Sequence, residues 1–531
     1  MKIFNKIKKI PNREEIIKIL SGIIALILIY YIAKFSVFSS AEDVKNRTIF
    51  PIILLIIFLS SSRKAFWLLC FPFVLIHAIY LPIGAGFGKI NHTFLESLEN
   101  TNTGEIIEFI QLIPVKYFFI SIFMLAGIIL YRIILKITGI ELWKNKFLII
   151  TLLMVTLSKS SAFKFPNELT DAIQAFAHER EKLQRIDKNV SWEITDVNSK
   201  YENYVLIIGE SARKDYHGAY GYPVNNTPFM SQSPGVLVDG LTSPAPNTVA
   251  SLKIMLTDSD KELVSPRYNM NFVKLANQAG FDTTWISNQG NFGIYDTAIS
   301  FIANQSKTKF FLKKDGYDSI NTDDFSLLPI FEKVINTPSS HPARLFVLHL
   351  MGSHPSTCER LHDYPNHYLT DDKKYLDLGC YLASIEKTDK LIARVHDILK
   401  ERFIKNNEKF SIIYFSDHGL SSKILDDGYI SMRHLNTREQ YSVPLFKISS
   451  DDTQRTVIKN FKSGLNMTLG LSTWLGIKTR NHINKYSLFA EKIDDQDYGY
   501  IEKLQKLPSN PLIDITPHLA KNVNRTNLTE H

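Results

Sequence analysis

Acidic and imidazole side chains stand at the ends of three short apolar stretches, each typical of a buried strand. The stretches are YVLII, RLFVLHL and FSIIYFS, and the side chains at or just past their ends are Glu210, His349, His354, Asp417 and His418. Any one of these would be ordinary as a turn acid or a satisfied histidine. Three strand ends together favour a shared site, and mixed carboxylate and imidazole ligands suit zinc or manganese. We therefore predict that Glu210, Asp417 and His418 hold a metal ion, Zn²⁺ in preference to Mn²⁺.

A metal with few protein ligands leaves room for a nucleophile, either a water molecule or a side-chain hydroxyl. The candidate hydroxyl is Thr248, in the segment DGLTSPAPNTVASLKIMLT between the first two strands. It lies at the start of an expected helix, 249–256, whose free N–H groups would stabilise an anion. An ordinary helix cap, with Asn247 before it, explains the same residues, so both interpretations stay open at this point.

Strands and helices alternate through the second part of the chain. A fourth strand-like stretch is FDTTWIS at 281–287, and helical stretches include NFVKLANQAG and LASIEKTDKLIARVHDILKERF. This alternation predicts an α/β fold with a mainly parallel sheet between helices. In such folds ligands bind at the carboxyl ends of the strands, which is where the acids and histidines stand.

The first 165 residues are mostly apolar and contain five runs that reach or approach the roughly 20 residues that cross a bilayer as a helix. The runs lie at about 16–38, 49–61, 65–83, 114–135 and 147–163. The second is short and the fifth is interrupted near Lys159, so a hairpin or an interfacial helix stays open for both. Basic residues at the N-terminus and in two loops predict a cytoplasmic N-terminus, and everything after about Phe165 is expected outside the cytoplasm.

The composition therefore predicts four parts. They are a transmembrane domain of five helices (1–164), a linker with an amphipathic helix (165–200), an extracytoplasmic catalytic domain (201–510) and a polar C-terminal tail (511–531). The linker helix fits either the membrane surface or a plain connection. We expect the tail to be poorly ordered after about Pro511.

The formal net charge of +8 is partly explained by the basic cytoplasmic flanks. No basic run rich in Arg and Gly or interleaved with aromatic residues argues for nucleic acid, so we expect a membrane-facing surface and no nucleic-acid partner. Cys70 lies within the third apolar run. Cys358 and Cys380 lie in the domain expected outside the cytoplasm, where disulfides persist, and we expect them to pair.

Four motifs, in order along the chain, resemble those of the phosphoethanolamine transferases, which are membrane-anchored members of the alkaline phosphatase/sulfatase superfamily. The motifs are GESARKDYHGAYGYPVNNTPF, NTVASLKIML, LHLMGSH and SDHG. The resemblance covers nearly the whole chain, including five membrane helices before an extracytoplasmic catalytic domain. It implies zinc ligands at Glu210, Thr248, Asp417 and His418, with Thr248 as the nucleophile. The histidines that it implies near the transferred group are His349, His354 and His434.

The resemblance extends to HTFLESLENTNTGEIIEF, between the third and fourth crossings, which resembles a segment that faces the active site. It implies donor contacts at Glu105 and Thr101, while Ser97 stands where several relatives have an amide. The sequence departs from the lipid A-modifying relatives at Pro244 and Ile254, where those relatives have cysteines. The pattern GSHPSTCERL looks closer to the branch that decorates the lipopolysaccharide core.

The expected function is transfer of phosphoethanolamine from phosphatidylethanolamine, through a covalent threonine intermediate, to lipopolysaccharide (core or lipid A) or another envelope glycan. The resemblance implies a multi-pass protein of the bacterial inner membrane, with its catalytic domain in the periplasm and a second zinc left open. One alternative is a phosphoglycerol transferase of the lipoteichoic-acid-synthase type, and another is a non-catalytic, membrane-tethered envelope protein. A sulfatase is disfavoured, because the Cys/Ser-x-Pro-x-Arg segment that formylglycine requires is missing at Thr248.

Overall fold

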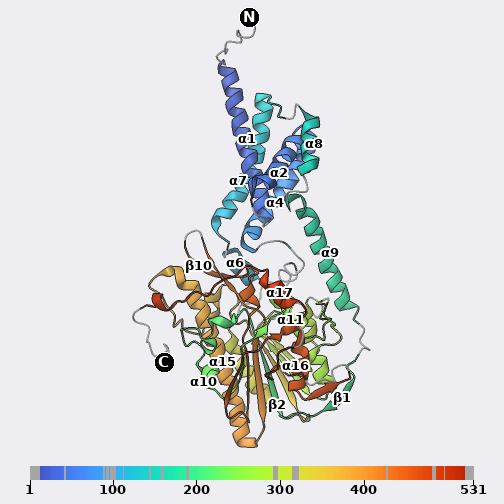
Figure 1. Cartoon of the computed structure of the whole chain (residues 1–531), viewed down its shortest axis with the longest axis vertical. Helices are drawn as coiled ribbons and strands as arrows, with labels where there is room; N and C mark the ends of the chain where they lie inside the picture. Colours follow the sequence, from blue (N-terminus) through green and yellow to red (C-terminus); the bar gives the residue numbers. More distant parts are fainter. Residues whose placement is uncertain are drawn as a thin grey trace. The chain divides into compact units, whose positions relative to one another are not determined.

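The computed structural model (Figure 1) forms two compact units, Met1–Leu95 with Ile110–Ala175 and Glu96–Phe109 with Phe176–His531. It describes residues 12–40, 44–87, 90, 95, 103–111, 113–142, 145–156, 161–186, 191–262, 264–290, 297–313, 322–425, 428–480, 486–494 and 497–520. The segment Glu96–Phe109 therefore belongs with the larger unit, although the chain encodes it between two apolar helices of the smaller one.

The first unit is helical at all five of the apolar runs. Its helices are α1 (Arg13–Ser39), α2 (Asn46–Leu59), the continuous α3 (Arg63–Ala65), η1 (Phe66–Cys70) and α4 (Phe71–Phe87), α7 (Val115–Thr138) and α8 (Lys146–Thr156), followed by the start of α9 (Phe165–Gln184). Within the described residues, three of these helices are long and apolar enough to cross a membrane: Arg13–Ser39, Arg63–Ala85 and Val115–Thr138. Helices α2 and α8, with 14 and 11 residues, are shorter than the roughly 20 that a span needs.

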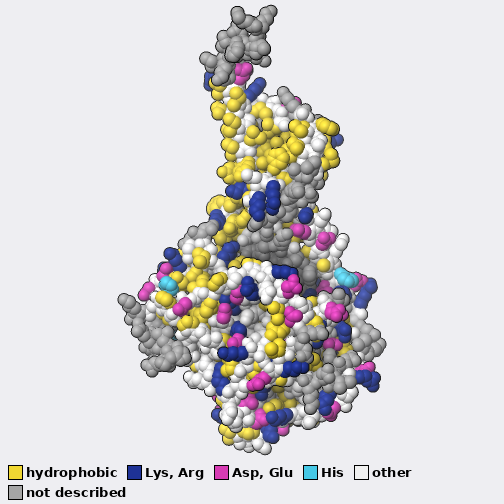
Figure 2. Space-filling view, in the orientation of Figure 1, with side chains coloured by type: hydrophobic (Ala, Val, Ile, Leu, Met, Phe, Trp, Pro, Cys, Tyr) yellow, Lys and Arg dark blue, Asp and Glu magenta, His cyan; other side chains and the backbone are white. Residues whose placement is uncertain are grey.

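Apolar side chains gather on the face of this helical unit that Figure 2 shows, and others form its interior. Ile19 and Leu20 on α1 are more than half exposed, as are Phe119 and Ile122 on α7. A water-soluble unit would not leave so many large apolar side chains exposed together, so this surface is suited to lipid. The chain is a membrane protein with its spans near the N-terminus.

The second unit is built on an eight-stranded sheet with the order β12-β3-β11-β8-β2-β7-β5-β6. The strands in that order are Arg455–Ile458, Gly235–Val238, Leu445–Ser449, Phe410–Ser416, Asn203–Gly209, Arg344–His349, Asp282–Ser287 and Thr308–Phe311. Only β11 pairs antiparallel to its neighbours; the other pairings are parallel. The predicted mainly parallel sheet is confirmed, with one reversed strand that the sequence did not indicate.

Helices cover both faces of this sheet, because the central strands are apolar on both sides. In β2, Tyr204 and Leu206 face a core shared with α11 (Thr248–Met255), α12 (Phe272–Gln278), α13 (Ala298–Ala303) and α16 (Met467–Trp474). Val205 and Ile207 face the opposite core, shared with α14 (Leu327–Ile335) and α15 (Leu376–Asn406). This alternation along β2 fixes its register, since a slip of one residue would exchange the two faces.

Smaller elements complete the unit. They are α6 (Thr103–Gln111), α10 (Pro228–Gln232), α17 (Tyr500–Gln505) and three two-stranded pairs, β1 (Ile194–Val197) with β14 (Ile477–Thr479), β4 (Leu241–Thr242) with β13 (Lys462–Ser463), and β9 (Ser421–Ile424) with β10 (Ile430–Arg433). The expectation of poor order after Pro511 is wrong for residues 511–520. Ile515 is fully buried there, and Tyr222 Oη donates to the carbonyl of Ile513 at 3.0 Å. Ile515, together with Ile513 and Leu519, supplies the apolar contact that holds this segment.

Candidate active site

The register of three neighbouring strands brings the predicted site residues to one edge of the sheet. Gly209 at the end of β2 pairs with Ser416 at the end of β8, so Glu210 and Asp417 follow side by side. On the other side of β2, Ile208 pairs with His349, the last residue of β7. Parallel strands place their carboxyl ends together, which is why residues more than 200 positions apart in the chain meet here.

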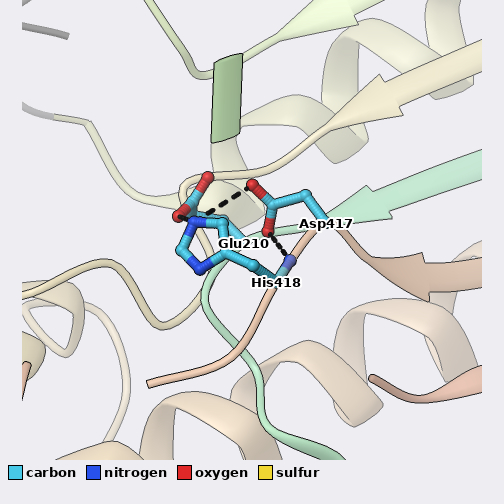
Figure 3. Close-up of side chains that lie close together, drawn as sticks. All are labelled: Glu210, Asp417 and His418. Carbon is cyan, nitrogen blue, oxygen red and sulfur yellow. Dashed lines mark hydrogen bonds and ion pairs between the residues drawn. The ribbon is translucent and has the colours of Figure 1, made fainter. Parts of the chain in front are cut away.

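Glu210, Asp417 and His418 form the centre of this site (Figure 3). Their ligand atoms all lie within 4.8 Å of one another. His418 Nε2 is 3.2 Å from Glu210 Oε1 and 3.4 Å from Asp417 Oδ2. All three side chains are buried, at 1%, 0% and 0% exposure. Two carboxylates and one imidazole so placed, with no solvent to screen them, are a candidate metal centre.

The bonds around these three residues fit a cation. His418 Nδ1 lies 3.0 Å from the carbonyl oxygen of Gly419, which only accepts, so Nδ1 carries the proton and Nε2 presents a lone pair to the carboxylates. Metal-binding histidines commonly have this arrangement. Asp417 Oδ2 is buried without a hydrogen-bond partner among the described residues. A positive ion at this point would satisfy both atoms.

Electrostatics supports the same conclusion. Burial, together with the neighbouring charge of Glu210, raises the pKa of Asp417 well above its usual range. Burial opposes the charged form of His418, but the two carboxylates outweigh it and raise the pKa of His418 to about 9. The buried carboxylate pair therefore requires positive charge beside it, from a proton or from a metal ion.

Thr248 is the hydroxyl that the structure places against this centre. Its Oγ1 donates to Glu210 Oε2 at 2.8 Å and lies 3.3 Å from His418 Nε2. The cap of helix α11 is formed by the preceding residue, since Asn247 Oδ1 accepts from the backbone N–H of Ala250 at 3.0 Å. Thr248 is half-buried and thus reachable. Asn247 therefore provides the side-chain cap, while Thr248 Oγ1 is directed to the Glu210 carboxylate.

The three remaining histidines lie around the same edge in different settings. The rings of His434 and His418 have centroids 4.9 Å apart, and His434 Nδ1 faces the carbonyl of Pro246 at 3.3 Å. Burial, and then the charges of His418 and His354, lower the pKa of His434 to about 3. His434 and His354 are half-buried, whereas His349 is only 3% exposed. His434 is consequently neutral near pH 7, with Nε2 able to accept a proton.

The turn after β2, which positions Glu210, contains a strained backbone conformation at Ser211. Ser211 has φ of 60°, a left-handed conformation that costs a non-glycine residue about 1–3 kcal/mol. In return its Oγ donates to Glu210 Oε1 at 2.6 Å and its N–H donates to Asp417 Oδ1 at 3.1 Å. Gly352 of the LHLMGSH motif packs on the other side, where a Cβ would lie 2.8 Å from the backbone N and O of Glu210. Sequence reasoning missed Ser211, although it stands in the GESAR motif.

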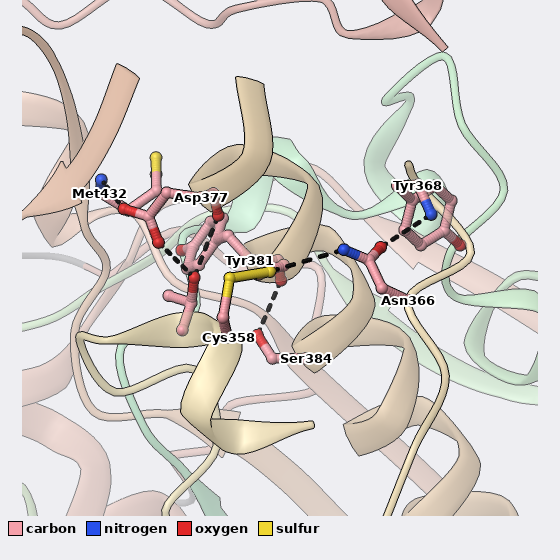
Figure 4. The surroundings of a disulfide bond; sticks show 9 residues. Cys358, Asn366, Tyr368, Asp377, Tyr381, Ser384 and Met432 are labelled. Carbon is pink, nitrogen blue, oxygen red and sulfur yellow. Dashed lines mark hydrogen bonds between the residues drawn. A yellow bond between two sulfur atoms is a disulfide. The ribbon is translucent and has the colours of Figure 1, made fainter. Parts of the chain in front are cut away.

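Cys358 and Cys380 form a disulfide, as predicted (Figure 4). It joins the loop after β7 to helix α15. The next residue along α15, Tyr381, donates from Oη to the carbonyl of Ser211 and accepts from the N–H of Arg213, both at 2.7 Å. The disulfide therefore anchors the helix that holds the turn following Glu210.

Of the three residues expected to contact the donor, only Glu105 lies on a described helix. Ser97 and Thr101 lie outside the described residues, and Glu105 lies on helix α6. On the same helix, Glu108 accepts from Arg360 Nη2 at 2.6 Å, and these side chains are 12% and 4% exposed. This ion pair ties α6 to the loop that carries His354, and no pattern in the sequence pointed to it.

Comparison with known proteins identifies this architecture. A family model described as Sulfatase matches residues 202–477, more than half of the chain, so fold and site define a member of the sulfatase family. The chain is 41% identical over 393 residues to a putative phosphoethanolamine transferase of Haemophilus influenzae, covering 72% of this chain and 80% of that one. It is 32% identical over 463 residues to the phosphoethanolamine transferase OpgE of Escherichia coli, covering 82% and 85%. Within the sulfatase family, the chain belongs to the phosphoethanolamine transferases.

A solved structure extends the similarity of fold to the membrane part. It is the integral membrane protein lipooligosaccharide phosphoethanolamine transferase A of Neisseria meningitidis, with a TM-score of 0.57 at 15% identity, covering 87% of this chain and 95% of that one. Neither sequence relative above is named for a lipopolysaccharide acceptor. The expected closeness to the branch that modifies the lipopolysaccharide core is therefore not supported.

Proposed function

We propose that this enzyme moves phosphoethanolamine from phosphatidylethanolamine onto a hydroxyl of an envelope glycan, through a covalent intermediate on Thr248. The carrying observation is the position of Thr248 Oγ1, 2.8 Å from Glu210 Oε2 and 3.3 Å from His418 Nε2. A hydroxyl that is half-buried, stands on the first residue of a helix and faces the buried acids is placed to be a nucleophile.

Glu210, Asp417, His418 and the Thr248 oxygen would hold Zn²⁺, with Mn²⁺ the weaker candidate. A zinc ion bound there would lower the pKa of the threonine hydroxyl and neutralise charge on the transferred group. A second zinc at His354 or His434 remains part of the proposal, and His434 supports it because its Nδ1 faces a backbone carbonyl, which leaves Nε2 as the ligand atom.

In the first step Thr248 Oγ1 attacks the phosphorus of the donor, and the bond from phosphorus to the diacylglycerol oxygen breaks. That oxygen takes the electron pair and a proton and leaves as diacylglycerol. His434 and His354 are the histidines proposed to carry protons to and from the reacting oxygens. The free N–H groups at the start of α11 stabilise the negative charge near Thr248.

The proposed topology places the second unit in the periplasm of a bacterial inner membrane. With a cytoplasmic N-terminus, either three or five crossings bring the catalytic unit to the opposite side, because both numbers are odd. Five crossings include α2 and α8, which are short for spans. The anchor keeps the enzyme in the bilayer that contains its lipid donor. Glu105, Thr101 and Ser97 are proposed donor contacts, with the carboxylate of Glu105 suited to the donor's ammonium.

The experiment compares Thr248→Ala and Thr248→Ser in the full chain in detergent. Alanine should abolish release of diacylglycerol from phosphatidylethanolamine while keeping bound zinc, because Glu210, Asp417 and His418 remain. Serine should retain part of the activity, since the hydroxyl is kept and only the methyl group that restricts its rotamers is lost. Near-parental release by the alanine variant would mean that a water molecule or another hydroxyl attacks.

A further inference from the structure

Residues 350–354 follow strand β7, and we call them the β7 turn. Ser353 in this turn donates its backbone N–H to the carbonyl of Glu210 at 2.9 Å. Gly352 lies against the same residue, so closely that a Cβ there would be 2.8 Å from the backbone N and O of Glu210. The turn ends at His354, one of the histidines at the edge of the candidate active site. The position of the β7 turn therefore bears on two of the residues proposed for the reaction.

Two further N–H groups of the β7 turn are bound by one carboxylate. The N–H of Met351 donates to Asp324 Oδ1 and the N–H of Gly352 donates to Asp324 Oδ2, both at 2.8 Å. Asn288 Nδ2 also donates to Asp324 Oδ1 at 2.8 Å. Asp324 is only 6% exposed and Asn288 is fully buried. Three N–H donors thus satisfy both oxygens of a buried carboxylate that no apolar strand pattern pointed to.

The segment that carries Asp324 is itself fixed to the domain. Asp324 is the first residue of η6 (Asp324–Ser326), a short 3-10 turn ahead of α14. The preceding residue, Asp323, accepts from Lys387 Nζ at 2.8 Å, and Lys387 Nζ also donates to the carbonyl of Arg360 at 2.7 Å. The side chain of Lys387, on α15, is 5% exposed. Asp324 is consequently a fixed point against which the β7 turn is set.

The two backbone bonds to Asp324 fix the orientation of the β7 turn as well as its place. Hydrogen bonds to a carboxylate are roughly twice as strong as neutral ones, and a pair of them on successive N–H groups leaves the peptide between them little freedom. Gly352 has φ of +51°, a conformation that glycine adopts readily but that the chain must still be held in. If the turn relaxed, the contact with Glu210 would loosen, and with it the 2.8 Å bond from Thr248 Oγ1 to Glu210 Oε2.

We propose that Asp324 is a positioning residue of the transferase, which acts through the β7 turn on Glu210 and His354. The proposal rests on the proposed function, because it assigns a role in that reaction. The bonds of Asp324 go to two backbone N–H groups and to Asn288, none of which is proposed to react. Asp324 therefore affects the geometry in which Glu210 accepts from the Thr248 hydroxyl. It sets the rate of the first step and not the binding of the lipid donor.

The test compares Asp324→Asn with a matched control, Asp389→Asn. Asparagine has nearly the same shape as aspartate, but one acceptor oxygen becomes an NH₂ group that faces a backbone N–H. Asp389 makes the same pair of bonds at the start of α10, where it accepts from the N–H groups of Phe229 at 2.8 Å and Met230 at 3.0 Å. Asp389 is 2% exposed. Each variant thus loses one of two bonds to successive backbone N–H groups at a buried position.

The full chain in detergent is mixed with phosphatidylethanolamine and no acceptor, at several donor concentrations, under conditions where denaturation curves show each variant to be folded. Mass spectrometry follows the phosphoethanolamine adduct on Thr248 over time. Asp324→Asn should lower the maximal rate of adduct formation about tenfold, as expected for one lost charge-assisted hydrogen bond. The donor concentration that gives half of the maximal rate should stay unchanged. Asp389→Asn should form the adduct at the parental rate.

A parental rate for folded Asp324→Asn, equal slowing by both variants, or a change only in the donor concentration needed would overturn the proposal. If Asp324→Asn does not fold, Asn288→Ala decides, because it keeps both backbone bonds to Asp324 and removes one side-chain donor. That variant should slow adduct formation about threefold, and an unchanged rate would refute the positioning role. A parent protein that forms no adduct would refute the proposed function, and the positioning role with it. A parent that forms the adduct beside an equally fast Asp324→Asn would refute the positioning role alone.

Discussion

Replacing Gly352 with alanine tests whether tight packing against Glu210 holds the candidate metal centre. Gly352 has φ of +51°, a conformation that costs an L side chain about 1–2 kcal/mol. Its new Cβ would lie 2.8 Å from the backbone N and O of Glu210 and 3.1 Å from Glu210 Cβ. Backbone atoms at the end of a central strand cannot rotate away, and overpacking of this kind costs about 1–3 kcal/mol. We expect the free energy of unfolding to fall by about 2–5 kcal/mol in total, with Glu210 displaced from Thr248.

The control is Gly499→Ala, where φ is +73° but no atom lies within 4 Å of the new Cβ. This variant carries the conformational cost alone, about 1–2 kcal/mol, and should keep zinc and activity. Unfolding of the full chain in detergent is followed by tryptophan fluorescence against denaturant, alongside zinc content and diacylglycerol release. Equal destabilisation of the two variants, or full activity of Gly352→Ala, would refute the reasoning.

Three further predictions concern the support around the site. Removing the disulfide with Cys358→Ser and Cys380→Ser should lower stability by about 3 kcal/mol in the chain-entropy model, checked as a fall in denaturant midpoint that reductant reproduces in the parent. Burial lowers the pKa of His217 to about 4. The unfolded chain, with a histidine pKa near 6.5, therefore binds the proton more strongly, and stability is lost as pH falls from about 6.5 towards 4. Between pH 7 and pH 5 this amounts to about 2 kcal/mol, and His217→Asn should remove that part of the acid sensitivity in denaturation curves; an unchanged slope would contradict it. Arg360→Met removes the charge facing Glu108 and should lower the free energy of unfolding more than the double variant Arg360→Met with Glu108→Gln does. A double-mutant cycle measures this difference, and purely additive effects of the two substitutions would contradict the prediction.

The mainly parallel sheet, and the edge of it where the candidate metal ligands lie, could be predicted from the sequence because both depend on local patterns. Each short apolar strand can be recognised separately from its own residues, with Glu210, His349 and Asp417 at or just past the strand ends. The parallel arrangement then brings these ends together. Pairing of Cys358 with Cys380 was also predictable, because they are the two cysteines of that domain and the third cysteine of the chain, Cys70, lies in the apolar N-terminal part. The reversed strand β11 was not, because an apolar strand reads the same in either direction.

Other features depend on long-range contacts that no local pattern reports. Arg360 meets Glu108 across 252 positions of the chain, and α6 joins the catalytic unit although apolar helices flank it in the sequence. The polar tail looked disordered by composition, yet Ile515 packs into the domain.

The measurement that tests the central claim most directly is the mass of the peptide containing Thr248 after incubation with phosphatidylethanolamine and no acceptor. The account predicts that this peptide gains one phosphoethanolamine group, that fragmentation places it on Thr248, and that diacylglycerol is released in equal amount. The Thr248→Ala variant should gain nothing. An unmodified peptide accompanied by diacylglycerol release, or the group found on another residue, would contradict the account.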